Sequence, residues 1–468
     1  MKDKNRKPIT IKNTTVWKEI AKVSDKLKIP VYLVGGSVRD PLMGLASTDN
    51  DFLVLGPSKS FAEKAGQYLS GSKIVHFPKF DSTFFYFEDR KLEFSSPRVP
   101  DSGLSERDWI TEDLKGRDFT INAIAAKLTG QDRLEIFDPL DGITDISEKN
   151  LRTPVDPRRT VSDDPIRIMR AFRFAAKFNL NIDPAMLKAM SESTEELGRI
   201  SNERIGEELW KILELKKPSK ALLPLHNIGA LKIILPEVAY LEGVEKRGKF
   251  NHKNVLLHSF KVLDNVAATG GDTITRFTAL VHDIAKPMTK RFDQVEGFTF
   301  HGHEDLGSKM VKSIAKRLRF SNDRIKLAGK LTLLHMRPVN LAGTIVSDSA
   351  IRRLMTQTGG DLDRLLALCR ADITSGNPVK AKRYLANFDF MIQRMKEVEE
   401  KDEMRAFQSP VRGEEIMEIC GLPPGPIIGK IKTAIEEAIL EGIIPNDYDA
   451  AKEYFITHKD EWLSGKDE

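Results

Sequence analysis

The chain has 468 residues, which leaves room for roughly three domains at about 150 residues each. Its 73 Lys and Arg residues slightly outnumber its 68 Asp and Glu residues. The resulting net charge of +5 excludes a polycationic tail, but it neither demands nor excludes a nucleic-acid partner. A hydrophobic content of 40% with 30% charged residues is ordinary for globular domains and excludes a disordered chain.

Signals for a membrane or an oxidising compartment are missing from the sequence. No apolar run approaches the roughly 18–20 residues of a membrane span. No apolar stretch follows the Lys-rich residues 1–10, so we expect neither a membrane partner nor a signal peptide. Cys369 and Cys420 form no pair motif, which excludes a disulfide framework and a cysteine-based zinc site. The expected location is the reducing cytoplasm.

In chain order, the first predicted element is an amphipathic helix that ends at Pro30. Its apolar residues at three- and four-residue spacing are Trp17, Ile20, Val23 and Leu27. Short β-rich runs follow, at 31–34, 51–55, 74–77, 83–87 and 91–94. After Asp156 the pattern is almost wholly helical, for example at 165–178, 184–193 and 202–215. The sequence therefore predicts an α+β chain, in which a mixed β-sheet with helices precedes an all-α part.

A buried strand at 31–34 runs into Gly35 and Gly36 before a helix begins at Ser37. Glycines permit a tight turn and a close approach of a ligand to the backbone. The helix start then offers free N–H groups and a positive dipole end to phosphate, and Arg39 could add a charge-assisted contact. A plain strand–turn–helix with Ser37 as N-cap explains this element equally well when it is taken alone.

Two carboxylates, Asp49 and Asp51, precede the apolar run 52–55. Positions i and i+2 of a strand share a face, so both side chains would point the same way. Two like charges are costly there unless a divalent cation lies between them, and Mg²⁺ usually takes one or two carboxylates plus substrate phosphates. A solvated turn is the alternative for an isolated pair. Glu93 is a third candidate ligand, with a cross-strand salt bridge as its alternative.

Together, these segments resemble the head-domain signature of the class II tRNA nucleotidyltransferases and bacterial poly(A) polymerases, within the polymerase-beta-like nucleotidyltransferases. The resemblance begins with LVGGSVRD at 33–40 and the two aspartates. It continues with GRDFTINA at 116–123, which is similar to the family's sugar-selecting motif except that Gly116 replaces an Arg. DPLDG at 138–142 resembles the motif that links head and neck, and DDPIRIMRAFRF at 163–174 resembles the nucleotide-templating helix.

The resemblance implies a role for each of these residues. Asp49 and Asp51, with Glu93 beside them, would hold two Mg²⁺ ions for the attack of an RNA 3′-hydroxyl on the nucleotide α-phosphorus. Gly35, Gly36 and Arg39 would position the triphosphate. Asp118 would accept a hydrogen bond from the ribose 2′-hydroxyl and Asn122 would brace it, with a polar loop cap as the alternative.

The resemblance also makes Asp164 and Arg167 a protein template. Their carboxylate and guanidinium would match the hydrogen-bonding edges of C and A, and U and G present the opposite pattern. A simple helix start, with Asp164 as cap and Pro165 in the first turn, explains the Asp-Pro pair but not the arginines that follow. The predicted nucleotide-binding residues are Gly35, Gly36, Ser37, Arg39, Arg117, Asp118, Asn122, Asp164, Arg167, Arg170 and Arg173.

Six of the nine histidines lie between residues 252 and 335, which favours metal or proton chemistry in this stretch. His258, the adjacent pair His282 and Asp283, and Asp372 resemble the H…HD…D pattern of an HD domain, a helical metal-dependent phosphohydrolase fold. Imidazole ligands suit Ni²⁺, Mn²⁺ or Co²⁺ better than Mg²⁺.

Two alternatives stay open for this part of the chain. The last ligand could instead be Asp361 or Asp363. The fold could also serve as an RNA-binding scaffold without phosphohydrolase activity.

The resemblance implies four parts: a nucleotidyltransferase head at 1–155, a helical neck with the templating helix at 156–245, an HD domain at 246–380 and a helical tRNA-binding tail at 381–468. The expected function is a CCA-adding tRNA nucleotidyltransferase, with tRNA, CTP and ATP as partners. A poly(A) polymerase or a partial CC- or A-adding enzyme is the alternative within the family. An HD phosphohydrolase with a nucleotide-sensing head is the alternative from another class. The sequence leaves the oligomeric state open.

Overall fold

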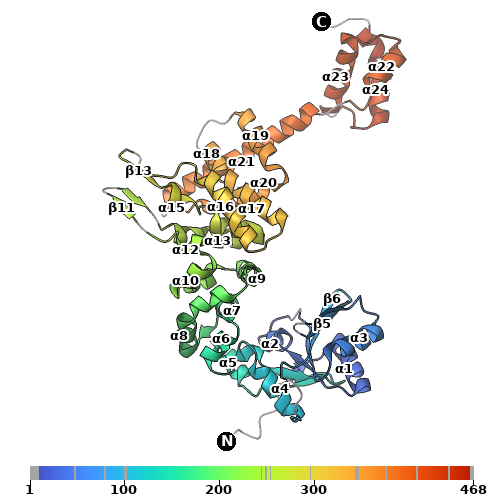
Figure 1. Ribbon diagram of the computed structural model, residues 1–468. Coiled ribbons are helices and arrows are strands. Elements are labelled where there is room, and N and C mark those ends of the chain that lie inside the picture. Colours follow the sequence, from blue (N-terminus) through green and yellow to red (C-terminus); the bar gives the residue numbers. More distant parts are fainter. Residues whose placement is uncertain are drawn as a thin grey trace. The chain divides into compact units, whose positions relative to one another are not determined.

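The computed structural model shows a chain of mixed strands and helices (Figure 1). The structure describes residues 10–46, 49–78, 81–99, 103–243, 245–247, 250–252, 254–295, 297–342, 347–374, 377–406, 409–440 and 443–463. The chain divides into two compact units, Met1–Arg337 with Thr358–Ala381, and Pro338–Gln357 with Lys382–Glu468. Within the described ranges, no helix combines the length and the apolar character that a membrane span requires.

A mixed sheet of eight strands, in the order β1-β8-β7-β2-β3-β6-β5-β4, organises the first part of the first unit. Its strands are β1 (Thr10–Lys12), β2 (Val31–Val34), β3 (Asp51–Val54), β4 (Val75–Phe77), β5 (Ser82–Phe87), β6 (Arg90–Ser95), β7 (Ala125–Lys127) and β8 (Arg133–Phe137). Strand β2 is antiparallel to β3 and β7, whereas β3 runs parallel to β6. The register of the parallel pair sets Asp51 beside Glu93.

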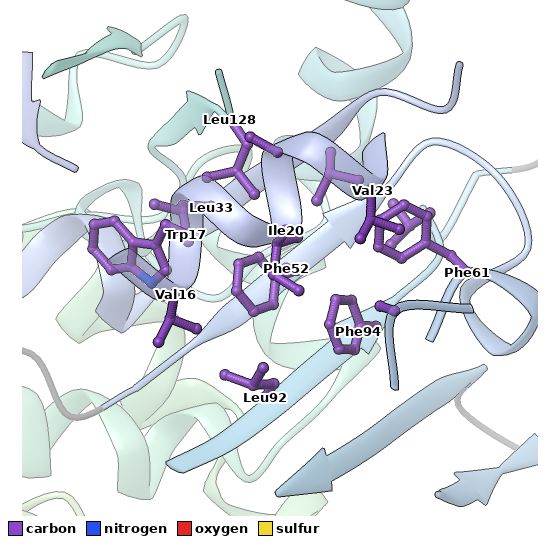
Figure 2. Packing of buried hydrophobic residues seen from close by; sticks show 14 of the residues in the cluster. Val16, Trp17, Ile20, Val23, Leu33, Phe52, Phe61, Leu92, Phe94 and Leu128 are labelled. Atoms are coloured by element: carbon purple, nitrogen blue, oxygen red, sulfur yellow. The ribbon is translucent and has the colours of Figure 1, made fainter. Parts of the chain in front are cut away.

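Helices cover both faces of this sheet. On one face, the apolar side of α1 (Thr15–Leu27) packs Trp17 and Ile20 against a cluster that contains Phe52 of β3 and Phe94 of β6 (Figure 2). Helix α3 (Ser58–Leu69) adds Phe61 to the same cluster. On the other face, α4 (Glu106–Lys115) contributes to a second apolar cluster with residues of β2, β3 and β7. Burial on both faces explains why β2 reads as a continuous apolar run.

Helices form most of the remainder of the first unit, as the sequence predicts. They are α2 (Gly36–Leu42), α5 (Gly142–Glu148), α6 (Pro157–Asp163), α7 (Arg167–Phe178), α8 (Pro184–Glu192), α9 (Asn202–Leu213), α10 (Ser219–Asn227), α11 (Ala230–Ile234), α12 (Pro236–Ala239), α13 (Val255–Ala268), α14 (Thr273–Val281), α15 (Lys286–Thr289), α16 (His303–Arg317), α17 (Asn322–Leu334) and α20 (Leu362–Asp372). Short pairs of strands interrupt them: β9 (Asn150–Leu151) with β10 (Asn181–Ile182), β11 (Glu245–Arg247) with β12 (Phe250–His252), and β13 (Arg291–Asp293) with β14 (Gly297–Thr299). The predicted α+β class is therefore confirmed.

Three helices in the second unit, α22 (Gly413–Cys420), α23 (Pro426–Leu440) and α24 (Tyr448–Leu463), share their own apolar core. Ile416, Ile431, Ile435 and Phe455 are fully buried there. Further helices of the chain are α18 (Met336–Ala342), α19 (Asp348–Thr358) and the long α21 (Pro378–Ala406).

Two details differ from the expectations. Ser37 does not cap α2, because the helix begins at Gly36 and its N-cap residue is Gly35. Helix α7 begins at Arg167 rather than Pro165, and Asp164 lies before it in extended conformation without capping it through its side chain. In both cases the polar side chain has a tertiary partner instead, as described below.

Candidate active site

The Gly35–Gly36 turn lies directly against the two predicted aspartates. Gly35 has a φ of 63°, a conformation that glycine adopts without strain. A Cβ atom on Gly36 would overlap the Asp49 carboxylate, and one on Gly35 would lie 3.6 Å from Asp51 Oδ2. Both carboxylates therefore face the same turn, and the absence of a side chain at Gly36 makes room for Asp49.

Buried polar contacts hold the acidic segment in place. The Ser37 hydroxyl donates to the Asp49 carbonyl at 3.0 Å and accepts the Asp51 N–H at 2.9 Å. Between the two aspartates, Asn50 accepts a 2.9 Å hydrogen bond from the Trp17 indole. Helix α1 and helix α2 thus both anchor the strand start that carries the carboxylates.

Glu93 completes an acidic group on neighbouring strands. Its carboxylate accepts hydrogen bonds from Ser82 Oγ at 2.8 Å and from Lys91 Nζ at 2.6 Å. Burial, followed by the charges of Asp49 and Glu93, raises the pKa of Asp51 from 3.8 to about 7. The residues present fit a divalent cation, because positive charge at this point would relieve that repulsion.

This acidic group borders a cavity of about 1430 Å³ that also reaches the neck helices of the first unit. Residues of the head and of α7 and α9 line it together. Among them are Gly35, Gly36, Arg39, Asp49, Asp51, Glu93, Arg117, Asp118, Asn122, Asp164, Arg167, Arg170, Arg173 and Arg204. The fold therefore brings the predicted nucleotide-binding residues to one space, apart from Ser37, which acts from behind the acidic segment.

Asp118 is buried and its carboxylate already has several donors. Oδ1 accepts from Asn122 Nδ2 and from the Phe119 N–H, both at 2.9 Å, and Oδ2 accepts from Arg170 Nε at 2.9 Å. Burial alone would raise its pKa, but Arg170, Asn122 and Arg167 outweigh that effect and lower the pKa to about 2. A ribose hydroxyl would therefore have to share this carboxylate with Arg170 or replace it.

The two template residues also have protein partners. Asp164 forms a 2.8 Å ion pair with Arg204 of α9, a residue that the sequence did not single out. Arg167 donates to the carbonyls of Gly116 at 2.7 Å and Thr160 at 3.2 Å. The other arginines differ in their partners: Arg173 pairs with the buried Glu208, and Arg117 pairs with Asp113 at 3.1 Å.

A second site lies in the helical part of the same unit, where ionisable side chains form two adjacent groups. Within each group the candidate ligand atoms lie within 4.8 Å of one another. The first group is His258, His282 and Asp372, and the second is Asp283, His303 and His335. Asp372 Oδ1 lies 2.9 Å from His258 Nε2, whereas Asp361 pairs with Lys330 instead.

Asp283 lies between the two groups. Its Oδ2 is 3.5 Å from His258 Nε2 and 3.3 Å from His282 Nε2, and its Oδ1 is 3.6 Å from His303 Nε2 and 3.8 Å from His335 Nε2. The H…HD…D pattern does not include His303 and His335. The concentration of histidines between residues 252 and 335 was the signal that could have found them.

The outer nitrogen of each of these histidines is occupied. Nδ1 of His282, His303 and His335 lies 2.6–2.9 Å from a backbone carbonyl, and Nδ1 of His258 lies 2.9 Å from the hydroxyl of Thr374. Such contacts favour the tautomer that leaves Nε2 as a lone-pair donor facing inward, as in metal sites. His282 Nε2 and Asp283 Oδ1 are buried without a hydrogen-bond partner among the described residues. This donor set fits metal ions.

Comparison with known proteins identifies three families along the chain. Residues 31–152 match the poly A polymerase head domain, and residues 179–241 match the probable RNA and SrmB-binding site of polymerase A. Residues 255–377 match the HD domain. These matches cover the acidic turn, part of the neck and the histidine groups, respectively.

Similar proteins cover most of the chain. An A-adding tRNA nucleotidyltransferase of Deinococcus radiodurans is 30% identical over 415 residues, which are 87% of this chain and 90% of the relative. A multifunctional CCA protein of Legionella pneumophila is 30% identical over 369 residues, 74% of this chain and 84% of the relative.

Solved structures agree with the fold. A CCA-adding enzyme in complex with ATP has a TM-score of 0.58 at 23% identity, and the match covers 94% of each chain. A Thermotoga maritima CCA-adding enzyme complexed with tRNA has a TM-score of 0.56 at 21% identity, again over 94% of each chain. The conserved extent of the sequence match, the polymerase head and the HD domain together show that this chain belongs to the tRNA nucleotidyltransferase and poly(A) polymerase family and is a nucleotidyltransferase.

Proposed function

We propose that this protein is a CCA-adding enzyme, which joins CTP, CTP and ATP in turn to the 3′ end of tRNA. One observation carries the proposal: a single cavity combines an acidic turn at Asp49 and Asp51 with the Asp164 and Arg167 pair beside α7. The relatives named as CCA proteins support the same assignment. No nucleic-acid template is needed, because protein side chains supply the base-selecting groups.

The reaction forms a bond between the RNA 3′-oxygen and the α-phosphorus of the nucleotide, breaks the bond to the β-phosphate and releases pyrophosphate. Asp49 and Asp51 would hold Mg²⁺ ions, with Glu93 adding negative charge beside Asp51. When bound, such ions lower the pKa of the attacking hydroxyl and neutralise charge on the pyrophosphate. The Gly35–Gly36 turn leaves backbone space beside these carboxylates for the phosphates.

Base selection would depend on Asp164 and Arg167. A carboxylate accepts from the exocyclic amino groups of C and A, and a guanidinium donates to their ring acceptors. Both side chains must first exchange their protein partners, Arg204 and the Gly116 carbonyl, for the base. Asp164→Ala should therefore lower the discrimination against UTP and GTP. Unchanged nucleotide selectivity in that variant would contradict the template role.

A partial, A-adding activity is the second candidate, because the A-adding relative is matched over 87% of this chain and the CCA protein over 74%. A gel assay separates them with three tRNAs that end before C74, after one C and after both C residues, each incubated with Mg²⁺ and CTP, ATP or both. Three added nucleotides on the shortest tRNA support CCA addition. Extension of the longest tRNA alone supports A addition, a long A tract supports poly(A) synthesis, and no extension rejects all three.

We also propose that the histidine groups hold two metal ions bridged by the Asp283 carboxylate. The alternating distances from Asp283 to the two histidine pairs support this arrangement, as do its unpartnered Oδ1 and that of His282 Nε2. Imidazoles suit Ni²⁺, Mn²⁺ or Co²⁺. When bound, such ions polarise a phosphoester and lower the pKa of water, so the proposed chemistry is phosphoester hydrolysis.

Metal analysis of the purified protein tests this centre without an activity measurement. Protein loaded with Mn²⁺ or Ni²⁺ and then desalted should carry two equivalents, and His303→Ala should reduce the content to one. A content that is independent of His303 would contradict the bridged pair. Hydrolysis of 2′,3′-cyclic nucleotides by the loaded protein then separates a phosphohydrolase from an RNA-binding scaffold, and Asp49→Ala, which should abolish tRNA extension alone, keeps the two activities apart.

A further inference from the structure

Arg39 borders the cavity, yet its side chain belongs to the protein interior. The residue is 5% exposed. Its guanidinium donates to its neighbour Asp40 through Nε at 2.7 Å and pairs with the same carboxylate through Nη2. The third nitrogen, Nη1, donates to Asn122 Oδ1 at 2.6 Å. All three nitrogens of Arg39 are therefore engaged within the head.

The planar faces of this guanidinium are covered from α7. The Arg39 Cζ atom lies 5.1 Å from the ring centre of Phe174 and 4.6 Å from that of Phe178. The two rings stack on each other with centroids 5.7 Å apart. An arginine in such contacts is attracted by the ring faces, and the attraction grows when water is excluded. Arg39 thus joins the head to the second half of α7.

A hydrogen-bonded chain joins the same residues to the first half of α7. Asn122 accepts from Arg39 and donates to Asp118 Oδ1 at 2.9 Å, and Asp118 Oδ2 accepts from Arg170 Nε at 2.9 Å. Arg170 precedes Phe174 by one helical turn. Two separate sets of buried contacts, one ionic and one aromatic, therefore hold one face of α7 on the head.

We propose that Arg39 is a positioning residue that holds the template helix against the acidic turn, and that it is not a ligand of the nucleotide triphosphate. The inference rests on the proposed function for its consequence, which is base selection beside α7. Arg39 lies three residues after Gly36, and Arg167 opens the helix on which Arg39 stacks. Contacts made by Arg39 would thus fix the distance between the reacting phosphate and the residues that read the base.

Hydrogen–deuterium exchange of residues 167–178 in the nucleotide-free protein tests the contact itself. Arg39→Ala and Arg39→Lys should both speed exchange in this segment, because a lysine keeps the charge but lacks the planar fork and the stacking surface. Arg158→Ala is the matched control, since Arg158 forms an exposed 2.8 Å pair with Glu192 elsewhere in the neck, and it should leave the segment unchanged. Wild-type exchange in both Arg39 variants would overturn the proposal.

Steady-state tRNA extension separates positioning from phosphate binding. With Arg39→Lys, inhibition by pyrophosphate should stay within about twofold of wild type, while the preference for CTP and ATP over UTP and GTP falls about tenfold or more. A ligand of the triphosphate predicts the reverse: weaker pyrophosphate inhibition in Arg39→Ala, partial recovery in Arg39→Lys and unchanged selectivity. That result would overturn the proposal. If the wild-type protein extends no tRNA, the proposed function fails, and the exchange experiment still decides whether Arg39 holds α7.

Discussion

The repulsion at Asp51 predicts an unusual stability effect: removing this carboxylate should stabilise the metal-free protein. Asp51 has its pKa raised from 3.8 to about 7 by burial and by the charges of Asp49 and Glu93. Below about pH 4 the carboxyl is protonated in both the folded and unfolded states. As the pH rises to 7, the unfolded chain loses this proton more readily, so the folded state becomes less stable.

The size of the effect follows from the same pKa values. A pKa raised from 3.8 to about 7 corresponds to an upper limit of about 4 kcal/mol above pH 7, and partial exposure to solvent reduces this to about 2 kcal/mol. Asp51→Asn keeps the side-chain shape and removes the charge. In EDTA at pH 8 it should raise the melting temperature of the head by about 4–8 °C, whereas at pH 4 the difference should nearly vanish.

Thermal unfolding followed by circular dichroism, with and without Mg²⁺, measures this. Mg²⁺ should stabilise the wild type and have little effect on Asp51→Asn, so the two melting curves should converge when the ion is added. Asp25→Asn, at an exposed position of α1, is the control for loss of one negative charge. A melting temperature of Asp51→Asn at or below that of the wild type at pH 8 in EDTA would refute the electrostatic reasoning.

Three further predictions follow from close contacts. Gly36→Ala should lower kcat for tRNA extension by about 100-fold with the fold retained by circular dichroism, because its Cβ would displace the Asp49 carboxylate; near-normal kcat would contradict this. Gly206→Ala should destabilise the first unit by about 1–3 kcal/mol in denaturant unfolding, since its Cβ would overlap the Leu318 carbonyl, and an unchanged midpoint would argue against the packing. The pKa of Asp118, lowered from 3.8 to about 2, contributes about 2 kcal/mol that is present above pH 4 and lost as the pH falls to 2; Asp118→Asn should lack this acid-side loss in melts between pH 5 and 2.

Much of the fold could be predicted because local patterns encode it. Alternation and glycine turns located the central strands to within a residue of their observed bounds, as in β5 and β6. Helical spacing located α1 and α7, although the start of α7 was placed two residues early. The hairpin of β7 and β8 was not predicted, since these strands are short.

The candidate sites were predictable in membership but not in arrangement. Ser37 reads as a helix cap in sequence, yet its hydroxyl bridges the backbone of Asp49 and Asp51. His303 and His335 lie outside the H…HD…D pattern and join it only because α16 and α17 pack together near α14. Such partners are separated by many residues, so no local pattern records them.

The sequence by itself determined which residue types this protein brings to its chemistry: the glycine pair, the carboxylates, the arginines of α7 and the histidine–aspartate pair. Spacing along one strand or one helix is sufficient for that, because i and i+2 on a strand and i and i+3 on a helix have a defined geometry. Only the tertiary structure decided their partners. It paired Asp164 with Arg204, buried Arg39 between Asn122 and α7, and set Asp283 between two histidine pairs, because these contacts depend on how distant segments pack.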